Sequence, residues 1–166
     1  MDTLIAIPIL FLTLLVQITT VSRLPLLHGT ADLVLLTLIA WGICTKTNNA
    51  WVWALIAGLM TSFVSAVPGL AIIISYIVVA FLAQLLHGRL WQSPILAMFL
   101  ITILGSFMVQ LTTLVFLNFN DIPLNFALAL EAIIIPSLIL NLFLSLPVYL
   151  LIKDISQWVY PVVEYE

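Results

Sequence analysis

The chain has 166 residues, of which 64% are hydrophobic and only 7% charged, with a formal net charge of −3. Soluble domains usually carry charge on about a quarter of their residues, so this composition excludes an ordinary soluble protein. Four scattered basic residues exclude a nucleic-acid partner. Apolar runs are continuous, as in IIISYIVVAFLAQLL, and this pattern favours membrane-spanning helices over an alternating β-barrel.

Spans are predicted where about 20 apolar residues lie between charges, polar clusters or Pro/Gly breaks. The first span is predicted at 4–21. The second lies between Asp32 and Lys46 and is short. A short span requires that its end charges snorkel toward water or that the bilayer thins around it.

The third span is predicted at 49–67 and carries small side chains at every fourth residue: Ala50, Ala54, Gly58, Ser62 and Ala66. In lipid, such a stripe lets two helix backbones approach closely. It predicts packing against a neighbouring helix of the same chain, with docking of a partner's single helix as the alternative. A break at Val67-Pro68-Gly69 leads to the fourth span, which ends at His87, so spans three and four should form an antiparallel hairpin.

The fifth span is predicted at 94–117 and the sixth at 133–152, with a possible extension back to Asn125. Pro136 and Pro147 should each kink the sixth helix or leave a carbonyl free, and Ser137 or Asn141 could bond to such a carbonyl. The sequence thus predicts an all-α polytopic membrane protein, with a six-helix transmembrane domain at 1–153 and a short cytoplasmic interfacial tail at 154–166.

An even number of spans places both termini on one side of the membrane. Lys46, Arg89 and Lys153 then share that side, whereas Arg23 alone lies on the other. Because an excess of basic residues marks the cytoplasmic face, both termini are predicted to be cytoplasmic.

Catalytic and metal chemistry have no support in the sequence. The only histidines, His28 and His87, are predicted on opposite faces of the membrane, about 30 Å of hydrocarbon apart. They cannot share a nucleophilic or metal site. No Gly-rich phosphate loop is present. We therefore expect no enzyme activity, no catalytic or metal-binding residues and no cofactor.

Polar residues within or beside the spans are the remaining candidates for function. Asp32, Asp121 and Glu131 map to outer span ends, and Glu131 is expected to be the most buried, either as an interfacial charge paired with Arg23 or as a partner or ligand contact. Uncharged polar residues should either join helices or line a shallow outward-facing polar cavity. The candidate partner-contact or helix-packing residues are Gln17, Arg23, Asp32, Ala54, Gly58, Ser62, Glu131 and Asn141.

The stretch VQITTVSRLPLLHGTADLVLLTLIAWGI (16–43) resembles the rod-shape-determining MreD family at Gln17, Arg23-Leu24, Gly29 and Asp32-Leu33. The likeness continues in the third and fourth spans and in the last helix, at Ala57-Gly58, Ser65, Pro68, Pro136, Asn141, Pro147 and Tyr149. The chain departs from the family pattern at Ser62, where an Asp is frequent, and at Ala66, where the turn has Gly.

The resemblance implies a non-catalytic scaffold of the bacterial cell-wall elongation machinery in the cytoplasmic (inner) membrane, helping to regulate peptidoglycan synthesis and cell shape. Its implied partners are MreC, then MreB, RodA and the penicillin-binding-protein partner of RodA, with contacts to MreC through 23–32, 117–131 and the small-residue stripe. The implied fold is similar to the six-helix substrate-binding subunit of energy-coupling-factor transporters. A vitamin-binding subunit of that type is the alternative function, although Ile5, Ile9, Leu12 and Val16 leave the first helix without a small-residue docking face.

Overall fold

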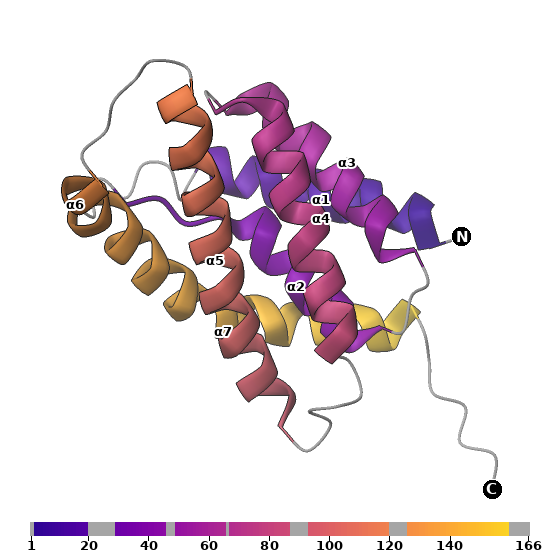
Figure 1. Ribbon diagram of the computed structural model, residues 1–166. Coiled ribbons are helices and arrows are strands. Elements are labelled where there is room, and N and C mark those ends of the chain that lie inside the picture. The colour runs from indigo at the N-terminus through magenta and orange to yellow at the C-terminus, as the bar shows by residue number, and fades with distance from the viewer. Residues whose placement is uncertain are drawn as a thin grey trace, which may run out of the picture.

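The computed structural model describes residues 2–19, 29–45, 49–65, 67–86, 93–119 and 126–159. Within these ranges every regular element is helical, which confirms the predicted all-α fold. Figure 1 shows the helices gathered into one bundle. In chain order they are α1 (Asp2–Thr19), α2 (Leu33–Cys44), α3 (Ala50–Val64), α4 (Gly69–Leu86), α5 (Pro94–Phe119), α6 (Phe126–Ala129), the π-helical segment η2 (Leu130–Ile134) and α7 (Ile135–Val159).

Three helical stretches in the described part of the chain are long and apolar enough to cross a membrane: Gly69–Leu86, Pro94–Phe119 and Leu130–Val159. Large apolar side chains also lie on the outside of the bundle. Phe63, Phe143 and Trp158 are 87%, 82% and 86% exposed. Water would strongly disfavour side chains of this kind on the surface, whereas lipid accepts them. These features are consistent with a membrane protein.

Helix α2 occupies the centre of the bundle and contacts α1, α3, α4, α5 and α7. Every residue from Leu33 to Gly42 is buried. With 12 residues the helix is about 18 Å long, well short of a hydrocarbon core of about 30 Å. Non-helical residues 29–32 lead into it and add about 10 Å in extended form.

Asp32 is the N-cap of α2, and its carboxylate accepts hydrogen bonds from Leu35 N at 3.0 Å and from the hydroxyl of Tyr76. Its side chain therefore bonds within the bundle, whereas snorkelling was expected for this end charge. Lys46 lies outside the described residues, so its snorkelling stays a prediction, as does a thinned bilayer. Segment 29–32 adds length to the short helix within the protein. Such non-helical backbone is tolerated at membrane depth where it is buried or lines a cavity, because its N–H groups must find partners there.

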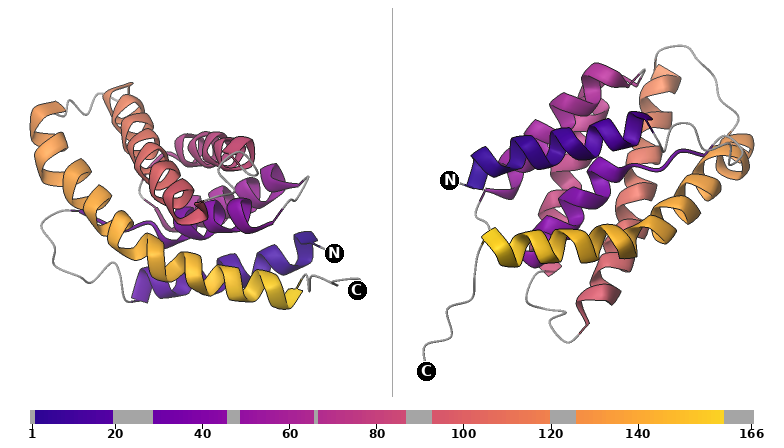
Figure 2. Two further views of the ribbon diagram at one scale, coloured as in Figure 1. Left: turned by 90° about the horizontal axis from the view of Figure 1, so that it is seen from below. Right: turned by 180° about the vertical axis from the view of Figure 1, so that it is seen from behind.

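Helices α3 and α4 form the predicted hairpin, lying side by side in both Figure 1 and Figure 2. The turn is closed by hydrogen bonds from Val67 N to Ser65 Oγ (3.2 Å) and from Ala71 N to Pro68 O (2.9 Å). The small-residue stripe of α3 faces α4, since a Cβ added at Gly58 would lie 2.9 Å from the Cα of Ile73.

Segments α6, η2 and α7 follow one another directly, so the predicted extension of the last span is present and the helix continues past Ile152 to Val159. In η2, Ile135 N donates to Leu130 O, five residues back, and this wider turn directly precedes Pro136, which has no N–H to donate. Ser137 and Asn141 were expected to bond a carbonyl freed by proline. They accept hydrogen bonds from the segment before α2 instead. Residues 160–166 of the predicted tail lie outside the described residues.

Candidate functional site

The extended segment 29–32 is held against α7 by two hydrogen bonds, each from a backbone N–H of the segment to a side chain of α7. Thr30 N donates to Ser137 Oγ at 3.0 Å, and Asp32 N donates to Asn141 Oδ1 at 2.8 Å. Gly29 is buried, and an added Cβ there would meet the backbone of Pro136 and Ser137 at less than 3 Å. Side chains of α7 therefore replace the helical partners that these two N–H groups lack.

The carboxylate of Asp32 joins α2 to α4. Its Oδ1 accepts from Leu35 N, and its Oδ2 accepts from the hydroxyl of Tyr76 at 2.6 Å. Tyr76 is fully buried. Both carboxyl oxygens act as acceptors, and the 2.6 Å distance to the Tyr76 hydroxyl is that of a strong O–H···O hydrogen bond.

Two amide side chains tie further helices to this point. Gln17 on α1 accepts a hydrogen bond at Oε1 from Val34 N (3.1 Å), which satisfies an N–H in the first turn of α2. Asn141 on α7 donates from Nδ2 to Ser106 Oγ on α5 (2.8 Å) while accepting from Asp32 N. We call the set Gln17, Asp32, Tyr76, Ser106 and Asn141 the junction.

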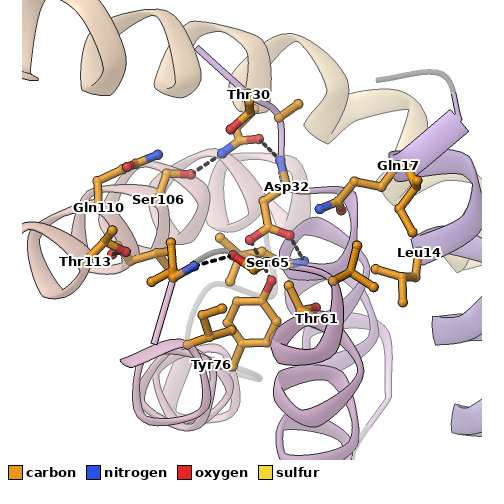
Figure 3. Close-up of a pocket in the computed structure, with 18 residues that line it drawn as sticks. Leu14, Gln17, Thr30, Asp32, Thr61, Ser65, Tyr76, Ser106, Gln110 and Thr113 are labelled. Carbon is orange, nitrogen blue, oxygen red and sulfur yellow. Dashed lines mark hydrogen bonds between the residues drawn. The ribbon is translucent and has the colours of Figure 1, made fainter. Parts of the chain in front are cut away.

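A partly open cavity of about 270 Å³ adjoins the junction. Figure 3 shows side chains from several helices converging on it around Asp32. We call it the junction cavity, and its polar lining consists of Gln17, Thr30, Asp32, Thr61, Ser65, Tyr76, Ser106, Gln110, Thr113 and Asn141. Its apolar lining consists of Leu14, Ile18, Ala31, Leu35, Val64, Val67, Ile72 and Val109.

The sequence candidates divide into three groups. Gln17, Asp32 and Asn141 meet at the junction. The candidates on α3 belong to the stripe: Ala54 and Gly58 are buried, and Ser62 lies where a Cβ at Gly69 would approach within 2.9 Å. Arg23 lies outside the described residues, so its pairing with Glu131 stays a prediction.

Glu131 was expected to be the most buried acid, and this prediction is wrong. Glu131 is exposed on η2, whereas Asp32 is partly buried inside the bundle. The apolar residues around Glu131 in sequence suggested burial, but the side chain lies on the outer face of its helix. Asp32 sits beside a loop in sequence, yet the loop residues after it enter the bundle.

Tyr76, Ser106 and Thr61 were missed as candidates. Each is an isolated polar residue in an apolar helix, and nothing local distinguishes it from a residue that bonds to its own helix. Tyr76 offered the best available signal, because a buried tyrosine hydroxyl usually needs a partner and the spans contain few acidic groups to provide one.

The junction is suited to holding helices and binding small polar groups. It combines one carboxylate with hydroxyl and amide groups, and no basic side chain is among the described residues that line the cavity. Within the described residues, no cluster of three His, Cys, Asp or Glu side chains could hold a metal ion. The described geometry provides hydrogen-bonding groups and one carboxyl group.

The fold and the junction define an all-helical protein with helices able to cross a membrane and a buried polar centre beside a short central helix. The chain matches no protein-family profile, no curated protein and no solved structure.

Replacing Asn141 with leucine should destabilise the protein by about 3 kcal/mol, because Asp32 N and the buried hydroxyl of Ser106 would lose their partner. Unfolding of the purified protein in mixed detergent micelles, followed by circular dichroism, measures this loss. Ile139→Leu, at a 60% exposed position on the same helix, is the control and should change stability by less than about 0.5 kcal/mol. Equal stability of the two variants would contradict the bridging role of Asn141.

Proposed function

We propose that this chain is a non-catalytic membrane scaffold of the bacterial cell-wall elongation machinery, of the MreD type, and that it binds MreC. One observation carries the proposal. The residues on which the MreD resemblance rests come from distant parts of the sequence, yet Gln17, Asp32 and Asn141 meet at the junction, and Gly29 packs on Pro136. A chance likeness in an apolar background would scatter such residues over the bundle.

In this proposal the chain crosses the cytoplasmic membrane six times with both termini in the cytoplasm. The start of α1 and the end of α7 lie on the same side of the bundle in all views of Figures 1 and 2, as an even number of crossings requires. The junction then faces the outer half of the membrane, and Lys153 on α7 lies near the inner surface, in agreement with the positive-inside rule.

The contact with MreC is assigned to the outer edge formed by α6 and η2. Here Leu128 and Ile135 are 65% and 45% exposed, and Glu131 is exposed between them. A charge flanked by apolar groups at a membrane edge suits a partner that enters the membrane by one helix and continues outside it. The stripe on α3 does not offer a second surface, because α4 covers Gly58.

Co-purification of MreC tests this proposal. The parent chain should retain MreC, and Glu131→Lys should reduce its recovery severalfold, because the substitution reverses the charge at the proposed contact. Asp154→Lys is the matched control: Asp154 is also exposed, on the same continuous helix, but at the opposite end. Failure of the parent chain to retain MreC, or equal recovery with both variants, would reject the proposed partner or its surface.

A second candidate function, a vitamin-binding subunit of an energy-coupling-factor transporter, gains support from the junction cavity. Its volume of about 270 Å³ is close to the lower limit of small-molecule pockets, and its walls combine polar and apolar groups. Tyr76 is the one aromatic residue among the described lining residues, which provides little surface for stacking on a vitamin ring. A vitamin recovered from the purified chain would favour this function over the scaffold.

A further inference from the structure

Thr61 lines the junction cavity and is only 8% exposed. Its hydroxyl lies beside that of Tyr76 but makes no hydrogen bond of regular geometry to a described residue. Several other helical threonines behave differently. Thr37 and Thr113, for example, donate to the carbonyl four residues back at 2.8 Å. A buried hydroxyl without a partner costs about 1–3 kcal/mol. Of the two described helical threonines in this state, Thr61 and Thr102, Thr61 is the one that lines the cavity.

The charge of the side chains that line the cavity indicates what kind of molecule would bind there. The carboxylate of Asp32 is the acceptor in both of its side-chain hydrogen bonds, and none of the described lining residues is basic. A carboxylate in a site of low dielectric constant attracts a cation and repels an anion. Free phosphates and carboxylates are disfavoured, whereas a positively charged hydrogen-bond donor is favoured.

The volume of the cavity limits the size of the group that can bind, and the residues at its border indicate what can be attached to that group. A volume of about 270 Å³ equals that of roughly nine water molecules at about 30 Å³ each, enough for a compact group. Ile18 and Val64 in the lining are 38% and 53% exposed, so apolar surface continues from the cavity to the outside of the bundle. An acyl chain could lie on this surface while its headgroup enters the cavity.

We propose that the junction cavity binds a primary ammonium group, carried by a small amine or by a lipid headgroup, with Asp32 accepting from the ammonium and Thr61 bonding to an adjacent polar atom. Asp32 and Thr61 lie on adjacent walls of the cavity in Figure 3. The proposal goes beyond the scaffold function and does not depend on it, since binding requires neither MreC nor a transport partner.

Ethanolamine is the probe for the free amine, and the purified intact chain in detergent is the sample. Saturating ethanolamine should raise the Tm by about 5 °C, whereas ethylene glycol and acetate, which are neutral and anionic, should leave it unchanged. Nanodiscs form the lipid arm, with phosphatidylethanolamine compared against phosphatidylglycerol. A response in one arm alone identifies the source of the amine, and no response in either arm overturns the proposal. An equal response to ethylene glycol also overturns it.

Two variants test the proposed contacts. Asp32→Asn keeps a good N-cap residue but removes the charge, so ethanolamine should bind at least about tenfold more weakly. Thr61→Val should weaken binding about tenfold and change the stability of the empty protein little, because the hydroxyl it removes makes no hydrogen bond of regular geometry.

Thr102→Val is the matched control for Thr61→Val. Thr102 on α5 is also buried, and its hydroxyl also lacks a described partner, but it does not line the junction cavity. Its replacement should leave ethanolamine affinity unchanged. Equal weakening by the two valine variants, or none by Thr61→Val, overturns the assignment of Thr61.

Discussion

Replacement of Gly58 by leucine is expected to force α3 and α4 apart and to lower the free energy of unfolding by about 4 kcal/mol or more. Even a single Cβ at this position would lie 2.9 Å from the Cα of Ile73 and 3.0 Å from its Cγ1. Because the closest atom belongs to the backbone of α4, a change of side-chain rotamer cannot relieve the contact. The helices must separate along the stripe, and they then lose the close packing that holds them together in lipid.

A graded series makes this prediction quantitative. Gly58→Ala gains about 1 kcal/mol of helix propensity, but overpacking against a backbone costs about 1–3 kcal/mol, so the variant should be destabilised. Gly105→Ala is the control, since the three atoms nearest its Cβ would all be side-chain methyl groups, two of Val79 at 3.1 and 3.2 Å and one of Ile39 at 3.5 Å. The control should remain close to the parent in detergent unfolding. A Gly58→Leu protein that elutes as a monodisperse species with parental stability would show that α3 and α4 do not pack in this way.

The Gly58 series also limits how partner binding can be tested. Gly58→Leu and Asp32→Lys both alter residues inside the bundle, so a loss of MreC in either variant would report misfolding. Exposed positions such as Glu131 separate the two effects.

Helix positions were predictable because they depend on local composition. Continuous apolar runs and the turn at Pro68-Gly69 predicted α4 within a residue or two, and Pro94 marked the start of α5. The small residues of α3 predicted close packing, because the spacing of four places them on one face whatever the neighbour is. The sequence could not identify that neighbour, although the minimal turn favoured α4.

The junction was not predictable in the same way, because its bonds join residues that are far apart in sequence. Asp32 was assigned to a membrane rim because a charge next to a loop normally lies there. The partners that allow it to lie deeper, Tyr76 and Asn141, belong to two other helices. Gln17 and Asn141 were recognised as residues that either join helices or line a cavity, and both descriptions apply: they bond across helices and line the same cavity.

The short central helix explains why a scaffold would need a polar junction. Helix α2 is surrounded on all sides, so its position fixes the relative positions of the helices that contact it. Hydrogen bonds at its N-terminal end give that position a defined depth, which apolar packing alone does not specify. A ligand in the junction cavity would touch α1, α3, α4, α5 and α7 together with the start of α2, so its binding would stabilise the whole arrangement.

Replacement of Gly29 by alanine should remove this arrangement altogether. The new Cβ would lie 2.6 Å from Pro136 Cβ, 2.7 Å from Ser137 N and 2.8 Å from Pro136 C, and two of these atoms are backbone. Either α7 moves or segment 29–32 withdraws from the bundle. In both cases the hydrogen bonds from Thr30 N to Ser137 and from Asp32 N to Asn141 are lost. Together with the steric overlap, the expected loss is about 4 kcal/mol or more.

Unfolding in mixed micelles and the monodisperse fraction on gel filtration measure the effect of Gly29→Ala. A second substitution separates steric overlap from other causes. Pro136→Gly removes the Cβ contact but leaves the backbone atoms of residues 136 and 137 in place, so the double variant should recover only part of the loss. Full recovery would mean that the proline ring alone restricts position 29. Parental stability of Gly29→Ala itself would mean that the segment before α2 does not enter the bundle beside α7, and the junction would then have no structural basis.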